Sequence, residues 1–225
     1  MRSTLGVGAK SRGIAFALVV VYIPRAARER YPYLTLLREA RPADCESVTA
    51  SPKYNCLMPA PDTPQIWKQL GDRRLVAAEA FYADEALKEF HRAADGYIAR
   101  AKNFRPPFVK RLPVAKRASY LATLPIPPDL MGQLIISYHF AHQRPLMASF
   151  LNALGIPNDN GLISEDIDST PPADEKLTEA VNSIKANYSP EDVYIYLATI
   201  HAQNPSAWRG LEPILEESHR ALTSG

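Results

Sequence analysis

This sequence of 225 residues has only two cysteines, and it lacks complete catalytic motifs and long apolar runs. The only two cysteines, Cys45 and Cys56, are too few for a disulfide framework, and their spacing fits no zinc-binding pattern. One disulfide in an oxidising compartment and two unpaired thiols stay open as alternatives, and unpaired thiols are favoured. No run of about 18 consecutive apolar residues occurs, so we expect no transmembrane segment.

No complete catalytic motif is present either. The chain has no Gly-x-Ser-x-Gly elbow, no paired-cysteine motif and no dinucleotide-binding fingerprint. The segment from Gly6 to Ser11 looks like a phosphate-binding loop, but Ala9 stands where that loop requires a glycine before the lysine. These absences favour a protein that is not an enzyme, although distant residues could still assemble a site in space.

Proline, by contrast, is abundant, with 20 residues in the chain, against a usual share of about 5%. Because proline interrupts regular structure, these residues divide the chain into short elements. Hydrophobic residues make up 46% of the sequence, which is enough for a real core. We therefore predict a mostly α fold, an irregular orthogonal array of about seven or eight helices. An N-terminal arm with a Pro-rich loop is expected over 1–62, and the helical domain over 63–225.

The stretch from Pro127 to Pro157 is predicted to be the centre of the fold. Pro128 suits a first helical turn, and Gly155 followed by Ile156 and a proline is a strong stop signal. Apolar residues between these ends cover most of a helix circumference, which predicts burial. Pro145 removes a backbone donor in the middle, so we expect a break near Arg144.

Two other segments test the helical prediction. A long proline-free element is expected from Asp72, as its cap, to about Arg105, with Gly96 as a place where it could divide. The run 193–200 has the composition of a strand, but Ser189 and a following proline form a typical helix start. We predict a buried helix there.

His139 and His142 form the one pair of side chains that suggests metal chemistry. Three residues apart on a helix, they would share a face and could ligate one ion. A catalytic metal needs at least a third ligand, for which His91, His201, Glu79 and Asp192 are candidates. A core histidine beside a surface histidine is the favoured alternative.

A basic segment follows Asp95, because the next acidic residue is Asp129. It contains Arg100, Lys102, Arg105, Lys110, Arg111, Lys116 and Arg117, with aromatic residues between them. Lys110, Arg111, Lys116 and Arg117 are the candidate residues for binding an anion or a nucleic acid. Residues 150–225 carry 12 acidic and 4 basic residues. The favoured alternative is therefore that the basic segment is an ordinary solvated face, or that it pairs with the acidic C-terminal part of the chain.

Residues 1–28 contain no acid and place basic residues ahead of the apolar run 14–23, as export signals do. A buried strand or short helix is the favoured alternative, so the cytoplasm is expected and export through 1–28 stays open. Our leading functional hypothesis is a non-enzymatic helical adaptor that binds protein. The alternatives are a metal-dependent helical enzyme using His139 and His142, and a binder of nucleic acid or another polyanion through residues 100–117.

Overall fold

A computed structural model of the protein describes residues 60–163 and 172–223. Within these ranges the chain forms ten α-helices and two short 3-10 helices, and no strand. The predicted mostly helical fold is therefore confirmed. The hypotheses about Cys45, Cys56 and residues 1–28 lie outside the described residues. In the two described ranges, no helix is both long enough and apolar enough to cross a membrane.

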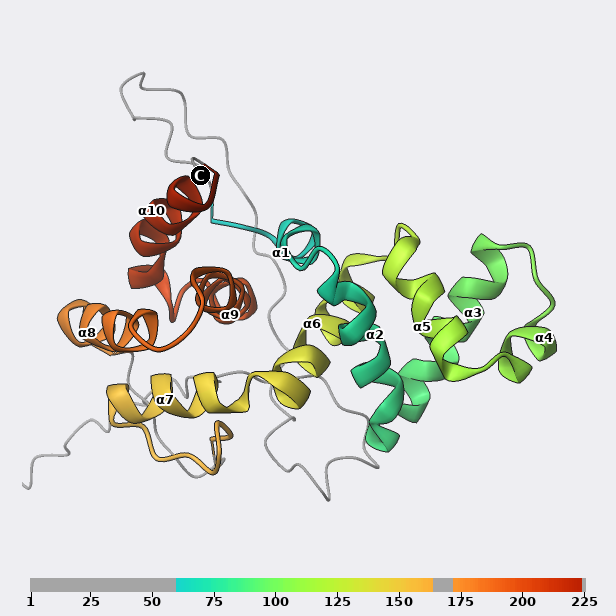
Figure 1. Ribbon diagram of the computed structural model, residues 1–225, viewed down its shortest axis with the longest axis horizontal. Coiled ribbons are helices and arrows are strands. Elements are labelled where there is room, and N and C mark those ends of the chain that lie inside the picture. The colour runs from blue at the N-terminus through green and yellow to red at the C-terminus, as the bar shows by residue number, and fades with distance from the viewer. Residues whose placement is uncertain (1–59, 164–171, 224–225) are drawn as a thin grey trace, which may run out of the picture.

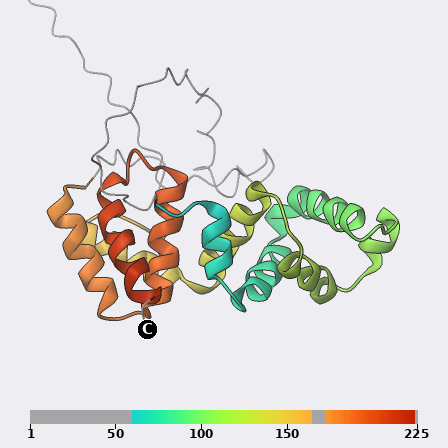
Figure 2. The same cartoon turned by 90° about the horizontal axis from the view of Figure 1, so that it is seen from above.

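The protein is elongated, and its helices are distributed along its length (Figures 1 and 2). The α-helices are α1 (Thr63–Gln69), α2 (Arg73–Ala83), α3 (Lys88–Ala101), α4 (Pro106–Arg111), α5 (Val114–Thr123), α6 (Pro128–His142), α7 (Arg144–Leu154), α8 (Asp174–Lys185), α9 (Pro190–Gln203) and α10 (Glu212–Thr223). Helices α3, α4 and α5 lie at one end, whereas α8, α9 and α10 lie at the other. Helix α2 packs against α5 and α6, and α1 contacts both α6 and α9, so these elements connect the two ends.

The predicted central stretch forms α6 and α7, and the break falls where Pro145 indicates. Helix α6 ends at His142 and α7 begins at Arg144. At the far end Gly155 takes the left-handed conformation with φ of 71°, and the Ile156 amide donates to the Leu151 carbonyl at 2.9 Å. This is the helix stop that the sequence predicts, because a left-handed glycine lets the chain fold back on the last turn.

Helix α9 confirms that the start signal outweighs the strand-like composition. The Ser189 hydroxyl accepts a hydrogen bond from the Asp192 amide, and Pro190 occupies the first helical position. Every residue from Val193 to His201 is buried. Burial on all sides removes the polar face that a surface helix would show, and this explains why residues 193–200 resemble a strand by composition.

The long element expected between Asp72 and Arg105 is divided, which is one reason why the helices outnumber the prediction. Asp84 is extended, with ψ of 104°, and its side chain accepts from the Ala86 amide to start a 3-10 turn. The division therefore comes from an aspartate that caps a new turn, whereas Gly96 lies inside α3. The prediction that Asp72 caps α2 is wrong, because Asp72 has helical dihedral angles and makes no capping hydrogen bond.

Gly161 is the glycine whose replacement we expect to be most harmful. Its φ is +86°, and an added Cβ would lie 2.7 Å from the Cβ of Met147 and 3.1 Å from the carbonyl oxygen of Arg144. We predict that Gly161→Ala lowers the free energy of unfolding by about 1–3 kcal/mol, because strain and overlap add together. The matched control is Gly96→Ala inside α3, where the nearest atom is 3.7 Å away. That change should stabilise the helix by about 0.5–1 kcal/mol. Urea denaturation of both variants measures the difference, and equal midpoints would contradict it.

Candidate nucleic-acid interface

The basic segment predicted from the sequence forms one end of the elongated molecule. We call residues 96–124 the basic tip, which consists of the C-terminal part of α3 with α4 and α5 (Figure 1). The tip contains seven lysines and arginines and no acidic residue. Its positive charges are therefore concentrated at one end of the protein.

One of these seven cations is internal. Arg117 Nη1 donates to both carboxylate oxygens of Asp95, at 2.9 and 3.1 Å, and the two side chains are only 16% and 10% exposed. The Tyr82 hydroxyl donates to the same carboxylate at 2.9 Å, and the guanidinium of Arg117 lies 4.6 Å from the centre of the Tyr82 ring. Burial, with a smaller effect of the carboxylate, raises the pKa of Tyr82, so this phenol stays a hydrogen-bond donor. Arg117 thus joins α5 to α2 and α3 and does not belong to an anion-binding surface.

The other six cations have a different environment. They are Arg100, Lys102, Arg105, Lys110, Arg111 and Lys116, and all six are exposed. Within residues 60–163 and 172–223 none of them forms an ion pair with an acidic side chain. Three of the four candidates from the sequence are among them. The tip therefore presents uncompensated positive charge to solvent.

An aromatic cluster lies between these cations. The rings of Phe104 and Phe108 meet edge-on with centroids 5.1 Å apart, and the Phe104 and Tyr120 centroids are 5.9 Å apart. The ammonium groups of Lys102 and Lys116 lie 5.4 and 5.2 Å from the centre of the Tyr120 ring. Phe108 is 49% exposed. The tip thus combines positive charge with one accessible aromatic ring.

Local helix electrostatics accounts for only part of this charge. Arg100, Lys110 and Arg111 lie in the last turns of α3 and α4, where the helix dipole favours cations. Lys116 and Arg117 fall in the first turn of α5, which contains no acidic residue. The N-terminal end of a helix dipole is positive, so cations at this end are unfavourable. Helices at the other end of the molecule follow the expected rule and carry acids in their first turns: Asp174, Glu175, Glu191 and Asp192.

The basic tip also lies far from the described acidic helices α8, α9 and α10. In both views α3, α4 and α5 are separated from α8, α9 and α10 by the central helices. Among the described residues, an ion pair joins Arg73 of the central helix α2 to Asp192 of α9, and neither residue belongs to the tip. The predicted intramolecular partner for the basic segment is therefore absent from the described part of the chain.

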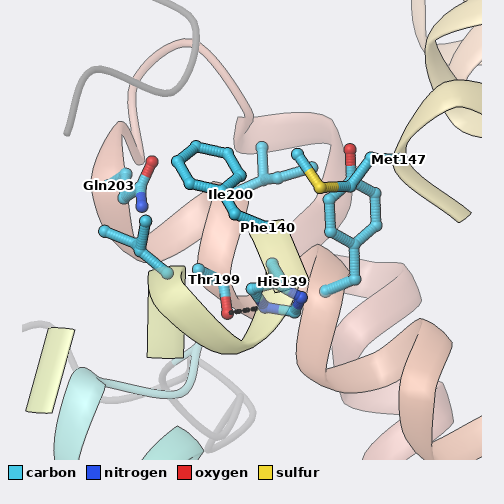
Figure 3. Close-up of a pocket in the computed structure, with 8 residues that line it drawn as sticks. His139, Phe140, Met147, Thr199, Ile200 and Gln203 are labelled. Atoms are coloured by element: carbon cyan, nitrogen blue, oxygen red, sulfur yellow. Dashed lines mark hydrogen bonds between the residues drawn. The ribbon is translucent and has the colours of Figure 1, made fainter. Parts of the chain in front are cut away.

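His139 and His142 do not share an environment. His139 is 4% exposed, and its Nε2 lies 3.0 Å from the Thr199 hydroxyl, to which it points (Figure 3). His142, by contrast, is exposed. The Thr199 hydroxyl donates to the Ile195 carbonyl at 2.7 Å, so it accepts from the His139 ring and fixes the proton on Nε2. No group of three metal-ligating side chains comes together in residues 60–163 and 172–223. The two-histidine metal site stays a prediction to which the geometry adds no third ligand.

A small pocket lies beside His139, between α6, α7 and α9. Its walls include Phe140, Met147 and Gln203 as well as the His139–Thr199 pair (Figure 3). The cavity volume of about 10 Å³ leaves room for about one water molecule. Burial lowers the pKa of His139 to about 3, so the imidazole is neutral at physiological pH. The pocket as it stands is too small to hold an organic substrate.

The sequence does not show which cations of the tip are exposed and which one pairs with a carboxylate inside the protein. Lys116 and Arg117 are adjacent in the sequence and carry the same charge, yet the Arg117 side chain is only 16% exposed whereas Lys116 is exposed to solvent. One signal was available: Asp95 is the last carboxylate before the acid-free segment, so a buried cation of α5 has few other nearby partners. The sequence shows Phe108 as one of several aromatic residues in this segment, and it does not indicate that this ring is the exposed one.

Comparison of the chain with known proteins finds no matching family model, no matching curated protein and no matching solved structure.

Proposed function

We propose that the protein binds nucleic acid through the basic tip. The observation that carries this proposal is the set of six exposed cations that have no acidic partner among the described residues. Phosphate groups are the natural counter-charges for such a surface, and aromatic rings among the cations are typical of surfaces that bind nucleic acid. The cations are placed by short helices and rigid prolines, which keeps them together.

The number of charges is sufficient for measurable binding. A protein that neutralises a few phosphates binds without sequence preference at dissociation constants of about 10⁻⁴–10⁻⁶ M at physiological salt. Each phosphate contact steepens the dependence of the binding constant on salt concentration by about 0.7 for a single strand and about 0.9 for a duplex, on logarithmic scales. Affinity should therefore fall steeply as salt is raised.

Charge reversal at the end of α4 tests the proposal. We predict that Lys110→Glu with Arg111→Glu weakens binding of a fluorescein-labelled oligonucleotide at least about tenfold at low salt, because two phosphate contacts become repulsive. The matched control is Lys176→Glu with Lys185→Glu on α8. These two lysines are also exposed and have no ion-pair partner in the described ranges, and the change in net charge is identical.

Fluorescence anisotropy as a function of salt distinguishes the outcomes. The tip variant should also show a salt dependence that is shallower by about 1.4 units, and the control variant should bind as the wild type does. If both variants lose affinity equally, net charge alone is responsible, and the proposal is overturned. Unchanged binding by the tip variant would overturn it as well.

The adaptor hypothesis has weaker support from the described surface. Four large hydrophobic residues are exposed there: Leu75, Val76, Phe108 and Val114. Two of them belong to α2, and the other two belong to the basic tip. Single exposed apolar residues are ordinary on proteins, whereas a protein-binding site usually shows a contiguous apolar patch. The six exposed cations of the basic tip support a nucleic-acid partner more directly than these four residues support a protein partner.

A further inference from the structure

We infer that the nucleic acid is single-stranded and that an unpaired base stacks on Phe108, an inference that depends on the proposed function. The ring is 49% exposed and belongs to α4. Two residues later the same short helix ends with Lys110 and Arg111. One six-residue helix thus presents an accessible ring and two positive charges together.

The other rings of the cluster are less suited to a base. Tyr120 has the ammonium groups of Lys102 and Lys116 against its ring, and these cations occupy the positions that a stacked base would need. Phe104 is only partly exposed and packs between Phe108 and Tyr120. Phe108 therefore lies at the edge of the cluster, where it contacts Phe104 and leaves about half of its surface accessible to solvent.

The local backbone makes this ring a rigid platform. Pro106 and Pro107 form the first turn of α4, where fixed φ angles favour the helix. The next residue after Phe108, Val109, is fully buried and anchors the helix to the rest of the tip. An exposed ring that is already ordered loses little conformational freedom when a base stacks on it.

An accessible aromatic ring on the protein favours binding of a single strand over binding of a duplex. In a duplex the bases are stacked and paired, so a protein ring can reach their faces only if a base is unstacked at a cost of a few kcal/mol. In a single strand every base offers a face, and stacking on an aromatic side chain is tolerant of sequence. Positive charge alone would serve either form, so Phe108 is the feature that selects the single strand.

A lipid surface fits the tip less well. Helices that lie in a membrane interface bury a long apolar face, whereas α4 has six residues and its Val109 points inward. Phe108 and Val114 are the large apolar side chains that the tip exposes. A single ring and a single valine suit a stacked base better than an acyl layer.

Phe108→Ala and Phe108→Trp test the inference without touching any charge. Four probes are used: a single-stranded thymidine oligonucleotide, a duplex of the same length, heparin, and vesicles containing anionic phosphatidylserine. We predict that Phe108→Ala weakens thymidine-oligonucleotide binding about fivefold or more and leaves heparin binding unchanged, because heparin has no bases to stack. Phe108→Trp should retain binding and show quenching of its fluorescence when the oligonucleotide is added. Thermal melting of each variant verifies the fold.

The outcomes separate this inference from the proposed function. Binding of the thymidine oligonucleotide by Phe108→Ala at the wild-type level would overturn stacking, and so would tighter binding of the duplex or of the vesicles. The proposed function would still stand if the Lys110 and Arg111 charge reversal abolished oligonucleotide binding. If that reversal changed neither oligonucleotide nor heparin binding, the proposed function itself would fail.

Discussion

Asp95→Ala is expected to lower the free energy of unfolding by about 3–5 kcal/mol, the largest effect that we predict. The substitution leaves the guanidinium of Arg117 in a buried position without its carboxylate partner. Arg117 Nε already has no hydrogen-bond partner and is buried, so little compensation is available. The Tyr82 hydroxyl would lose its acceptor at the same time. Urea denaturation measures the change, and α5 should lose protection against hydrogen exchange before the rest of the protein.

Two controls identify the buried position as the cause. Glu89 forms an ion pair with Arg92 at 2.8 Å on the same helix, but both side chains are more than half exposed. Glu89→Ala should therefore cost less than about 1 kcal/mol. The double variant Asp95→Leu with Arg117→Met removes both charges and should recover most of the loss, because apolar groups need no partner. If Asp95→Ala costs no more than Glu89→Ala, the buried pair does not hold the tip.

Stability is expected to fall by about 2 kcal/mol between pH 7 and pH 5 because of His139. In the folded protein the pKa of this histidine is about 3, since burial disfavours the charged ring. In the unfolded chain its pKa is near the ordinary value of about 6.5. Between these two values the unfolded chain binds a proton that the folded protein does not, so acid favours unfolding. The stabilisation is complete above about pH 6.5 and is lost progressively as the pH falls towards 3.

His139→Phe should remove most of this pH dependence, and His142→Phe should leave it unchanged. His142 is exposed and serves as a matched control on the same helix. A smaller dependence of the same sign should persist in the His139 variant, because burial also lowers the pKa of His91. Thermal melting from pH 5 to pH 7 checks the result. A wild-type midpoint that does not change over this range would contradict the burial of a neutral His139.

Sequence signals predict many helix ends correctly because these depend on neighbouring residues, although they fail at Asp72 and at Asp84. The sequence predicts the helix starts at Ser189 and Pro128 and the helix stop at Gly155, because caps and prolines act within one turn of the chain. The division at Asp84 was missed, since an aspartate that starts a new turn has the same appearance in a sequence as one on a helix surface.

Contacts between distant residues could not be derived in the same way. Asp95 and Arg117 are 22 positions apart, and Arg73 and Asp192 are 119 apart. Nothing local indicates which of many opposite charges will meet when several helices pack. For the same reason the sequence grouped Arg117 with Lys110, Arg111 and Lys116, although only those three are exposed. The charge of the candidate site was predictable, whereas its boundary was not.

The burial of α9 on every side has a consequence for how this protein can change over evolutionary time. Nine consecutive positions, from Val193 to His201, have no solvent face at which a larger or a charged residue could be accommodated. A substitution that enlarges one side chain of this helix must therefore be compensated by a smaller side chain at a position that it contacts. The basic tip has the opposite property, since most of its side chains project into solvent. The sequence of the tip can diverge while the buried helix keeps the architecture constant.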